Sequence, residues 1–210
     1  HSKDKEHPEM RSYVLKKITG SPDWSAIDVM PIDNLLWTEP PVDIRAQAQL
    51  CWDDEAIYVH LRAWETEIRA VHNTPMQSVC EDSCLEFFFR PTDDLRYFNM
   101  EFNLNCALYL GFGPNMPELT RLAVQDEAEI FRPHAQRTED GWEIFYRVPF
   151  FLVRRFFPDF RPEIGLAMYG NCYKCGDKTV KPHFLSWNPI RSVEPQFHCP
   201  QDFGRLILGD

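Results

Sequence analysis

Apolar and polar residues alternate along much of the chain, which is the pattern of half-buried β-strands. Residues 46–50 are Ala-Gln-Ala-Gln-Leu, and residues 57–61 are Ile-Tyr-Val-His-Leu. Three acids, Asp53, Asp54 and Glu55, separate the two runs. They lack the alternating ligand spacing of a calcium loop, so the segment predicts a β-hairpin with a solvated acidic turn.

Aromatic residues and turn signals predict further strands. Residues 84–90 and 97–111 are rich in Phe, Tyr and Leu, which favours a buried, pleated setting. The Asp140-Gly141 dipeptide is a preferred tight turn and predicts a second hairpin. The remaining strands are expected over residues 131–137, 142–148, 164–173 and 203–208.

Helical patterns are scarce by comparison. Residues 149–157 predict one short helix, which ends before Pro158. About ten strands with one short helix predict an all-β fold, and we expect a two-sheet antiparallel β-sandwich. Residues 1–10 are polar and predict a flexible lead-in, so residues 11–210 are expected to form a single domain.

Composition narrows the choice of partners. The chain has 210 residues, of which 44% are apolar and 16 are Phe, so it has ample material for a large core. Its formal net charge of -10 repels phosphate backbones, and no nucleic-acid partner is expected. No run approaches the roughly 18 apolar residues of a membrane-spanning helix, and no such segment is expected.

The seven cysteines are an odd number, and most lie in apolar runs. They are therefore expected to act as small hydrophobic side chains, with no cofactor bound. The alternative is zinc held by Cys172, Cys175, His183 and Cys199, because thiolates and imidazoles suit this metal. If residues 169–175 form one extended strand, however, Cys172 and Cys175 point to opposite faces.

Two acids interrupt otherwise apolar strands. Glu86 and Glu101 are candidates for the paired carboxylates of a glycoside hydrolase. Paired acids serve equally to accept hydrogen bonds from sugar hydroxyl groups, or to form salt bridges. The common motifs of nucleotide-binding, hydrolytic and metalloprotease sites are absent from the sequence, which favours a binding role over a catalytic one.

The segment 176–200 is long, has no periodicity and is rich in Pro, His, Trp and Asn. Long ordered loops often carry function. Trp187 lies between Ser186 and Asn188, and its ring is a candidate platform for a pyranose, with His183 and Asn188 beside it for the hydroxyl groups. The alternative is that the Trp187 ring closes one end of the sandwich.

Five segments occur in a recognisable order: residues 52–59, 81–88, 97–105, 141–150 and 170–187. This order resembles the carbohydrate-binding module family 9-like domains, relatives of a wider haem- and sugar-binding sandwich superfamily. The resemblance implies a non-catalytic, sugar-binding β-sandwich that works beside polysaccharide-degrading enzymes. Such a role in polysaccharide catabolism implies a secreted, periplasmic or cell-surface location.

The resemblance also implies site residues. In the best-understood members a sugar lies between two Trp rings, with a Glu, an Arg and an Asn nearby. Glu86 matches the Glu, and Trp187 matches the second Trp. The first Trp falls near residues 79–80, where Tyr173 or Trp64 is a candidate replacement, and Glu101 occupies the Arg position. Together, these arguments predict a carbohydrate site of six residues: Trp187, Glu86, Glu101, Tyr173, His183 and Asn188.

Two other functions stay open from the sequence. One is a hydrolase acting through the Glu86 and Glu101 carboxylates. The other is an electron-transfer domain, because the superfamily includes domains that ligate haem through Met and His. Met100, Met168 and His183 are the candidate haem ligands.

Overall fold

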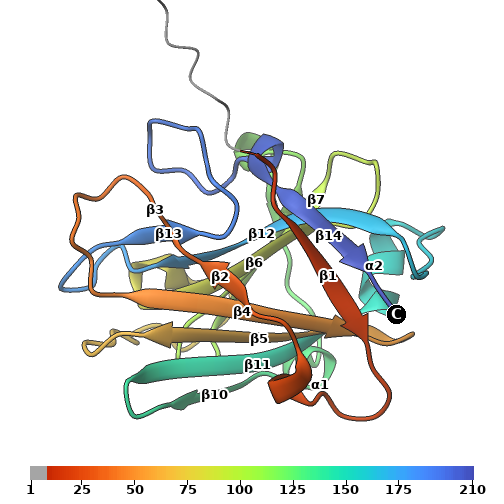
Figure 1. Ribbon diagram of the computed structural model, residues 1–210, viewed down its shortest axis with the longest axis horizontal. Coiled ribbons are helices and arrows are strands. Elements are labelled where there is room, and N and C mark those ends of the chain that lie inside the picture. The colour runs from red at the N-terminus through yellow and green to blue at the C-terminus, as the bar shows by residue number, and fades with distance from the viewer. Residues whose placement is uncertain (1–8) are drawn as a thin grey trace, which may run out of the picture.

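The computed structural model describes residues 9–210, which form mostly β-strands and a few short helices (Figure 1). The strands are β1 Ser12–Lys17, β2 Met30–Ile32, β3 Asn34–Leu35, β4 Arg45–Trp52, β5 Ala56–Trp64, β6 Cys84–Arg90, β7 Tyr97–Phe102, β8 Leu108–Gly113, β9 Thr120–Arg121, β10 His134–Arg137, β11 Gly141–Pro149, β12 Ala167–Cys175, β13 Phe184–Ser186 and β14 Gly204–Leu208. The α-helices are α1 Glu127–Phe131 and α2 Phe150–Phe156, and 3-10 turns lie at Trp24–Ala26, Val79–Glu81, Met116–Glu118 and Pro200–Asp202.

The strands form one mixed sheet in the order β10-β11-β5-β4-β1-β14-β12-β6-β7-β8-β9, with β2 beside β4 and β13 between β12 and β3. Strand β1 joins the two halves, because its first part pairs in parallel with β14 and its last two residues pair in parallel with β4. The predicted β-rich fold is confirmed. The sheet differs from the predicted pair of antiparallel sheets in being continuous and mixed.

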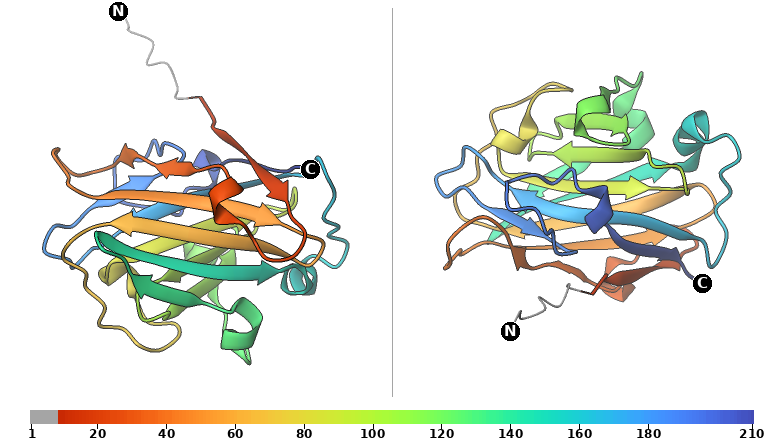
Figure 2. Two further views of the ribbon diagram at one scale, coloured as in Figure 1. Left: turned by 60° about the horizontal axis from the view of Figure 1, so that its bottom comes forward. Right: turned by 90° about the horizontal axis from the view of Figure 1, so that it is seen from above.

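The sheet curls so that its halves face each other, as the two views in Figure 2 show. Successive side chains of a strand point to opposite faces, so one face of each half supplies the apolar core. Phe102 of β7 meets Tyr146 of β11 across this core, with ring centroids 4.7 Å apart. The β6 residues Leu85, Phe87 and Phe89 also point into it. The alternate residues of β6 point to the opposite face, away from this core.

Both predicted hairpins are confirmed. Strands β4 and β5 pair with Trp52 opposite Ile57, and Asp53 shapes their turn by accepting hydrogen bonds from the Ala56 N–H and the Tyr58 hydroxyl. Strands β10 and β11 pair around the second turn. A Cβ atom on Gly141 would lie 1.9 Å from a backbone oxygen of β5, so this position needs glycine for the close approach of the two strands.

Three predicted strands are wrong in extent. Residues 131–137 begin in α1 and form β10 only from His134, and residues 164–173 are replaced by β12 Ala167–Cys175. Residues 97–111 do not form a single strand, because a turn divides them into β7 and β8. The Asn103 side chain accepts hydrogen bonds from the N–H groups of Asn105 and Ala107, and Cys106 has a positive φ of 58°. Asn favours such turns over a continued strand. The predicted helix is confirmed as α2, whereas no sequence pattern predicted α1.

Residues 1–8 of the predicted lead-in lie outside the described residues. Over residues 9–210, no helix has the length and apolar character needed to cross a membrane. All seven cysteines are free thiols, and most are buried, in line with their predicted role as small hydrophobic side chains.

Candidate functional site

A cavity of about 250 Å³ lies on the face of β12, β6, β7 and β8 that points away from the core. Alternation along β6 sends Glu86 and Phe88 toward this face. The long segment between β13 and β14 stands above the sheet in Figure 1, and its residues Pro195 to His198 form one wall. We call this cavity the sheet pocket. The predicted functional loop thus contributes to it, although through residues other than Trp187.

The floor of the sheet pocket carries two carboxyl groups. Glu86 of β6 and Glu101 of β7 are direct partners in the strand register, and their exposed fractions are 2% and 6%. Burial raises the pKa of Glu86 well above its ordinary value, and the neighbouring Glu101 raises it further. Burial also raises the pKa of Glu101, but hydrogen bonds from Glu86 and Asn99 oppose this rise. The pKa of Glu86 is therefore raised more strongly than that of Glu101, so Glu86 holds a shared proton more tightly.

A neighbouring amide orients Glu101. The Asn99 side chain donates a 2.8 Å hydrogen bond to Glu101 Oε2. Asn99 is itself fully buried. A Cβ atom on residue 111 would lie only 2.2 Å from Asn99 Oδ1, which is too close for both atoms to fit. Gly111 thus leaves the room in which Asn99 can reach Glu101.

An aromatic wall rises over the carboxyl pair. Trp37, in the loop between β3 and β4, packs against Phe184 and Phe197 with ring centroids 5.5 and 5.8 Å away. The Trp37 indole N–H donates to the backbone oxygen of Ser192, which fixes the ring. Trp37 also lies outside any periodic run. The lack of periodicity that marked Trp187 in the sequence therefore marks Trp37 as well.

The opposite side of the sheet pocket is polar. Arg121 of β9 donates a 2.9 Å hydrogen bond from Nε to the Tyr109 hydroxyl, and its guanidinium lies 4.8 Å from the centre of the Tyr109 ring. The pocket therefore contains an Arg, although Glu101 occupies the position that the family resemblance gives to Arg. Planar aromatic groups, carboxyl groups and a guanidinium surround one space, which suits a ligand with apolar faces and hydroxyl edges.

The structure brings only two of the six predicted site residues into the pocket, Glu86 and Glu101. Tyr173 is buried behind the wall, where it stacks on Phe197 at 4.3 Å. Trp187 is 3% exposed and belongs to the core, packed against Gly204 of β14. Asn188 donates to the Asp202 backbone oxygen and does not line the pocket.

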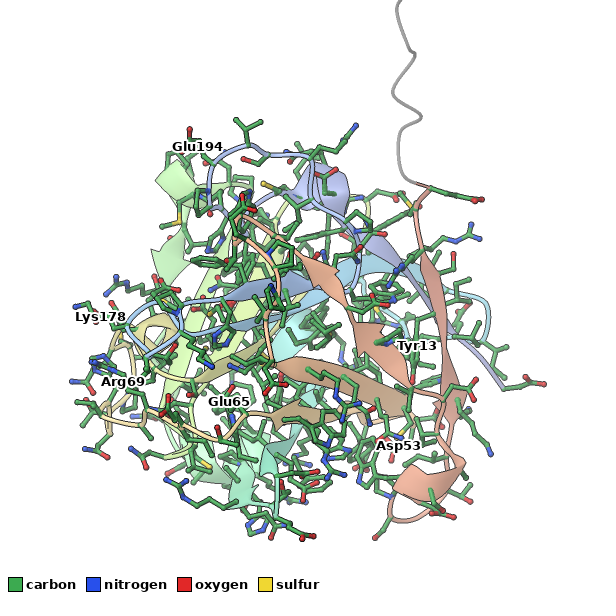
Figure 3. All side chains as sticks on the ribbon, turned by 60° about the vertical axis from the view of Figure 1, so that its left-hand side comes forward. Tyr13, Asp53, Glu65, Arg69, Lys178 and Glu194 are labelled. Carbon is green, nitrogen blue, oxygen red and sulfur yellow. The ribbon has the colours of Figure 1, made fainter. Side chains whose placement is uncertain are left out.

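His183, the sixth predicted residue, belongs to a buried charge cluster on the other side of β12. Lys174 Nζ lies 2.5 Å from Glu65 Oε2 and donates to His183 Nε2 at 2.6 Å. The Lys181 carbonyl accepts from His183 Nδ1, so the imidazole is neutral with its proton on Nδ1. Figure 3 shows Glu65 nearer the middle of the molecule than Lys178 and Arg69, which lie toward one edge.

This cluster predicts a pH-dependent stability. Burial, reinforced by the Lys174 ammonium, lowers the pKa of His183 from 6.5 to about 4. The folded state resists protonation of His183, so the contribution of His183 to the free energy of unfolding is complete above pH 6.5. It is lost as pH falls toward 4, by up to about 1.4 kcal/mol per pH unit. We expect His183→Gln to show a shallower decline of urea-unfolding free energy over this range. The exposed His134→Gln serves as the control, and equal slopes for His183→Gln and the wild type would contradict the prediction.

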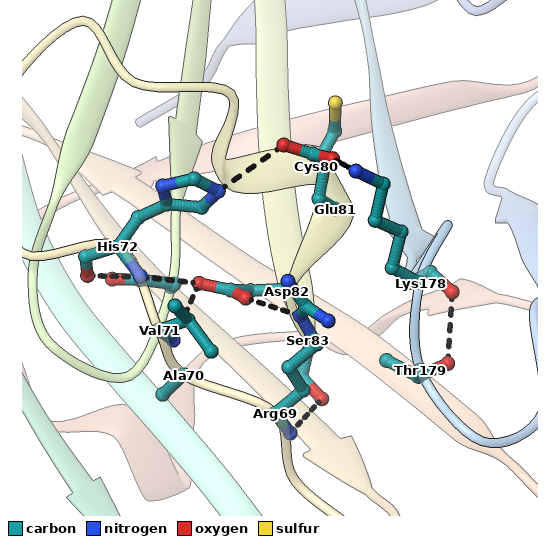
Figure 4. A network of polar contacts seen from close by, with 12 residues as sticks. Arg69, Ala70, Val71, His72, Cys80, Glu81, Asp82, Ser83, Lys178 and Thr179 are labelled. Carbon is teal, nitrogen blue, oxygen red and sulfur yellow. Dashed lines mark hydrogen bonds and ion pairs between the residues drawn. The ribbon is translucent and has the colours of Figure 1, made fainter.

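A polar network fixes the loop that enters the pocket beside β6 (Figure 4). Asp82 is fully buried and accepts hydrogen bonds from Arg69 Nε, from the N–H groups of Val71 and His72, and from Asn103 Nδ2, at 2.9 to 3.0 Å. Burial alone would raise the pKa of Asp82, but these bonds outweigh it and lower the pKa. The Asp82 network positions the adjacent 3-10 turn, whose Cys80 lines the sheet pocket.

The predicted zinc ligands do not come together. Cys172 lies in the core and Cys175 lines the sheet pocket, as expected for opposite faces of one strand. His183 is engaged by Lys174, and Cys199 packs in a separate cluster with Tyr173. A different group is close enough to share one ion: Cys84, Glu86 and Cys175.

The predicted haem ligands are also placed apart from the pocket. Met100 and Met168 are buried within the hydrophobic core. His183 holds its proton on Nδ1, and its Nε2 already accepts from Lys174. These placements do not favour haem ligation through the three predicted residues.

Comparison with known proteins adds independent information. The sequence model of a family described as carbohydrate-binding family 9 matches residues 22–208. The solved structure of a candidate carbohydrate-binding protein from Bacteroides uniformis is 31% identical to this chain, with a TM-score of 0.81 over 95% of this chain and 100% of that one. No curated protein matches the chain.

Two further structures are similar in fold. Both are of a carbohydrate-binding module of family 9 from Caldicellulosiruptor kristjanssonii, one in complex with cellotriose and one in complex with glucose. Each is 13% identical to this chain, has a TM-score of 0.68 and covers 95% of this chain. The matched share of the module is 94% in the cellotriose complex and 97% in the glucose complex.

Proposed function

The chain belongs to carbohydrate-binding family 9, and from this premise we propose that it binds an oligosaccharide or polysaccharide without transforming it. We place the sugar in the sheet pocket, over Glu86 and Glu101. The observation that carries this proposal is the pair of adjacent carboxyl groups beneath an aromatic wall. Sugar hydroxyl groups both donate and accept hydrogen bonds, so they suit carboxyl groups, which accept hydrogen bonds and also donate one when protonated.

The aromatic wall supports the same proposal. The C–H faces of a pyranose pack on electron-rich rings, and Trp37 with Phe197 offers such a surface above the carboxyl pair. Arg121 stands on the other side, where its guanidinium can donate to hydroxyl groups. The cavity of about 250 Å³ favours one end of a chain or a short segment over a long, flat stretch of polysaccharide.

A binding role is favoured over hydrolysis by the arrangement of the two acids. Hydrolases place a sugar between carboxyl groups that are about 5 Å or more apart. Glu86 and Glu101 are direct cross-strand partners that share a hydrogen bond, so they present one polar floor on a single side of the ligand. We further propose that the protein serves polysaccharide breakdown beside degrading enzymes, in the periplasm, at the cell surface or outside the cell.

Isothermal titration with glucose, cello-oligosaccharides and a wider sugar panel tests the proposal. We expect Trp37→Ala to weaken sugar binding by roughly 10- to 100-fold, because it removes the aromatic surface. Glu101→Gln should weaken binding as well, through loss of a carboxyl group that accepts hydrogen bonds from the sugar.

The matched control is Trp64→Ala. The Trp64 indole lies between Arg45 and Arg62, with guanidinium groups 4.7 and 4.6 Å from the ring, and it does not line the sheet pocket. Equal affinities for Trp37→Ala and wild type, or a loss seen only with Trp64→Ala, would refute the assigned position of the sugar.

A further inference from the structure

Two thiols and a carboxyl group lie close together at the floor of the sheet pocket. Cys84 of β6 and Cys175 of β12 are direct partners in the antiparallel register. Glu86 follows two residues after Cys84 and therefore points to the same face. One ligand atom from each of the three residues lies within 4.8 Å of the other two, and all three side chains are buried. We call these residues the thiol cluster.

We propose that the thiol cluster binds one thiophilic divalent cation, of which Zn²⁺ is the best match, through the sulfur atoms of Cys84 and Cys175 and the carboxylate of Glu86. Zinc accepts both sulfur and carboxylate oxygen ligands, and many of its sites use three protein ligands with one open position. Ligand atoms around such an ion lie about 3.5–4 Å apart. Small side-chain movements therefore close the observed spacing.

The state of Glu86 gives an independent reason to expect an ion. Its Oε2 is buried and receives no hydrogen bond from a donor group of residues 9–210, although the side chain is only 2% exposed. A buried carboxylate oxygen without a donor is costly, so Glu86 favours its proton when no ion is bound, and a bound cation would take the place of that proton. The Cys175 thiol donates only a long hydrogen bond of 3.8 Å to the Cys80 carbonyl oxygen and lies beside the Cys84 thiol, among residues 9–210.

Access and charge favour a cation at this position. Glu86 and Cys175 both line the sheet pocket, so an ion can enter from there. The described lining includes three carboxyl groups, from Glu86, Glu101 and Asp177, against one guanidinium from Arg121. The open fourth position of the ion would face the pocket, where water or a sugar hydroxyl can occupy it.

The inference differs from the zinc set expected from sequence. That set combined Cys172 with Cys175, whereas the extended β12 strand separates them onto opposite faces. Only Cys175 is common to both sets. Cys172 therefore provides a matched control, because it is a buried thiol on the same strand that faces the core.

Titration of the reduced, sugar-free protein with Co²⁺ tests the proposal, because thiolate–Co²⁺ bonds give a near-ultraviolet charge-transfer band and tetrahedral Co²⁺ gives strong visible bands. We expect both bands to saturate at one ion per chain and to disappear when Zn²⁺ is added. Cys84→Ala and Cys175→Ala should each weaken Co²⁺ binding by at least about 100-fold, and Glu86→Gln by about 10-fold or more. Cys172→Ala should keep both bands.

Lack of a thiolate band in the wild type would overturn the proposal, whatever the variants do. Persistence of the band in both Cys84→Ala and Cys175→Ala would overturn it too. Circular dichroism of each variant, compared with Cys172→Ala, separates loss of ligands from loss of folding. Because the titration contains no sugar, its outcome is independent of the proposed carbohydrate binding.

Discussion

Replacing Lys174 by methionine is expected to lower the free energy of unfolding by about 3–5 kcal/mol, one of the two largest effects that we predict for a single substitution. The Lys174 ammonium is fully buried, 2.5 Å from Glu65 Oε2, and Glu65 is itself 3% exposed at its side chain. Without Lys174, the Glu65 carboxylate stays buried with no compensating charge. Urea unfolding at pH 7.5, where His183 is neutral in both states, measures the effect.

The double variant Lys174→Met with Glu65→Leu is the informative control. Buried ion pairs replaced by apolar residues of similar size often leave stability unchanged or improve it. We therefore expect the double variant to recover most of the loss. A double variant as unstable as Lys174→Met alone would show that the ion pair does not account for the effect.

Trp187→Ala is expected to cost about 3–5 kcal/mol of stability while leaving sugar affinity near the wild-type value. The Trp187 ring fills the core beside Gly204, so its removal leaves a cavity. Thermal unfolding and sugar titration below the transition measure the two effects separately. Loss of sugar binding with unchanged stability would reverse this assignment and restore Trp187 as a sugar platform.

Local patterns predicted the parts of the fold that depend on neighbouring residues. Alternation and turn chemistry predicted the β4–β5 and β10–β11 hairpins because each forms from one short segment. The parallel pairing of β1 with both β4 and β14 joins segments far apart in the chain, and alternation carries no information on such partners. The mixed, continuous sheet was therefore beyond the reach of sequence patterns.

The site was predictable to a similar degree. Glu86 and Glu101 were found because a charge within an apolar strand is unusual, and both line the sheet pocket. Lys174 is likewise a charged residue within a largely apolar strand, β12. Its partner Glu65, however, follows the end of β5, which is far away in the sequence. Trp37 and Trp187 both lie outside periodic runs, and the neighbours and long segment that favoured Trp187 carry no information on packing, which decides which ring faces the pocket.

The thiol cluster illustrates the same limit. Strand alternation correctly separates Cys172 from Cys175, since this needs only the extended conformation of β12. The approach of Cys84 to Cys175 depends on the register between β6 and β12, which is set by the whole sheet. The Cys-x-x-Cys spacing associates Cys175 with Cys172, whereas the structure brings Cys175 beside Cys84.

The most direct test of the account is a crystal structure of the protein with a bound sugar, beginning with glucose and cellotriose. The account predicts a pyranose ring in the sheet pocket, in contact with Trp37 and with at least one hydroxyl group hydrogen-bonded to Glu86 or Glu101. A sugar bound elsewhere, for example beside Trp64, with the sheet pocket free of sugar, would contradict it.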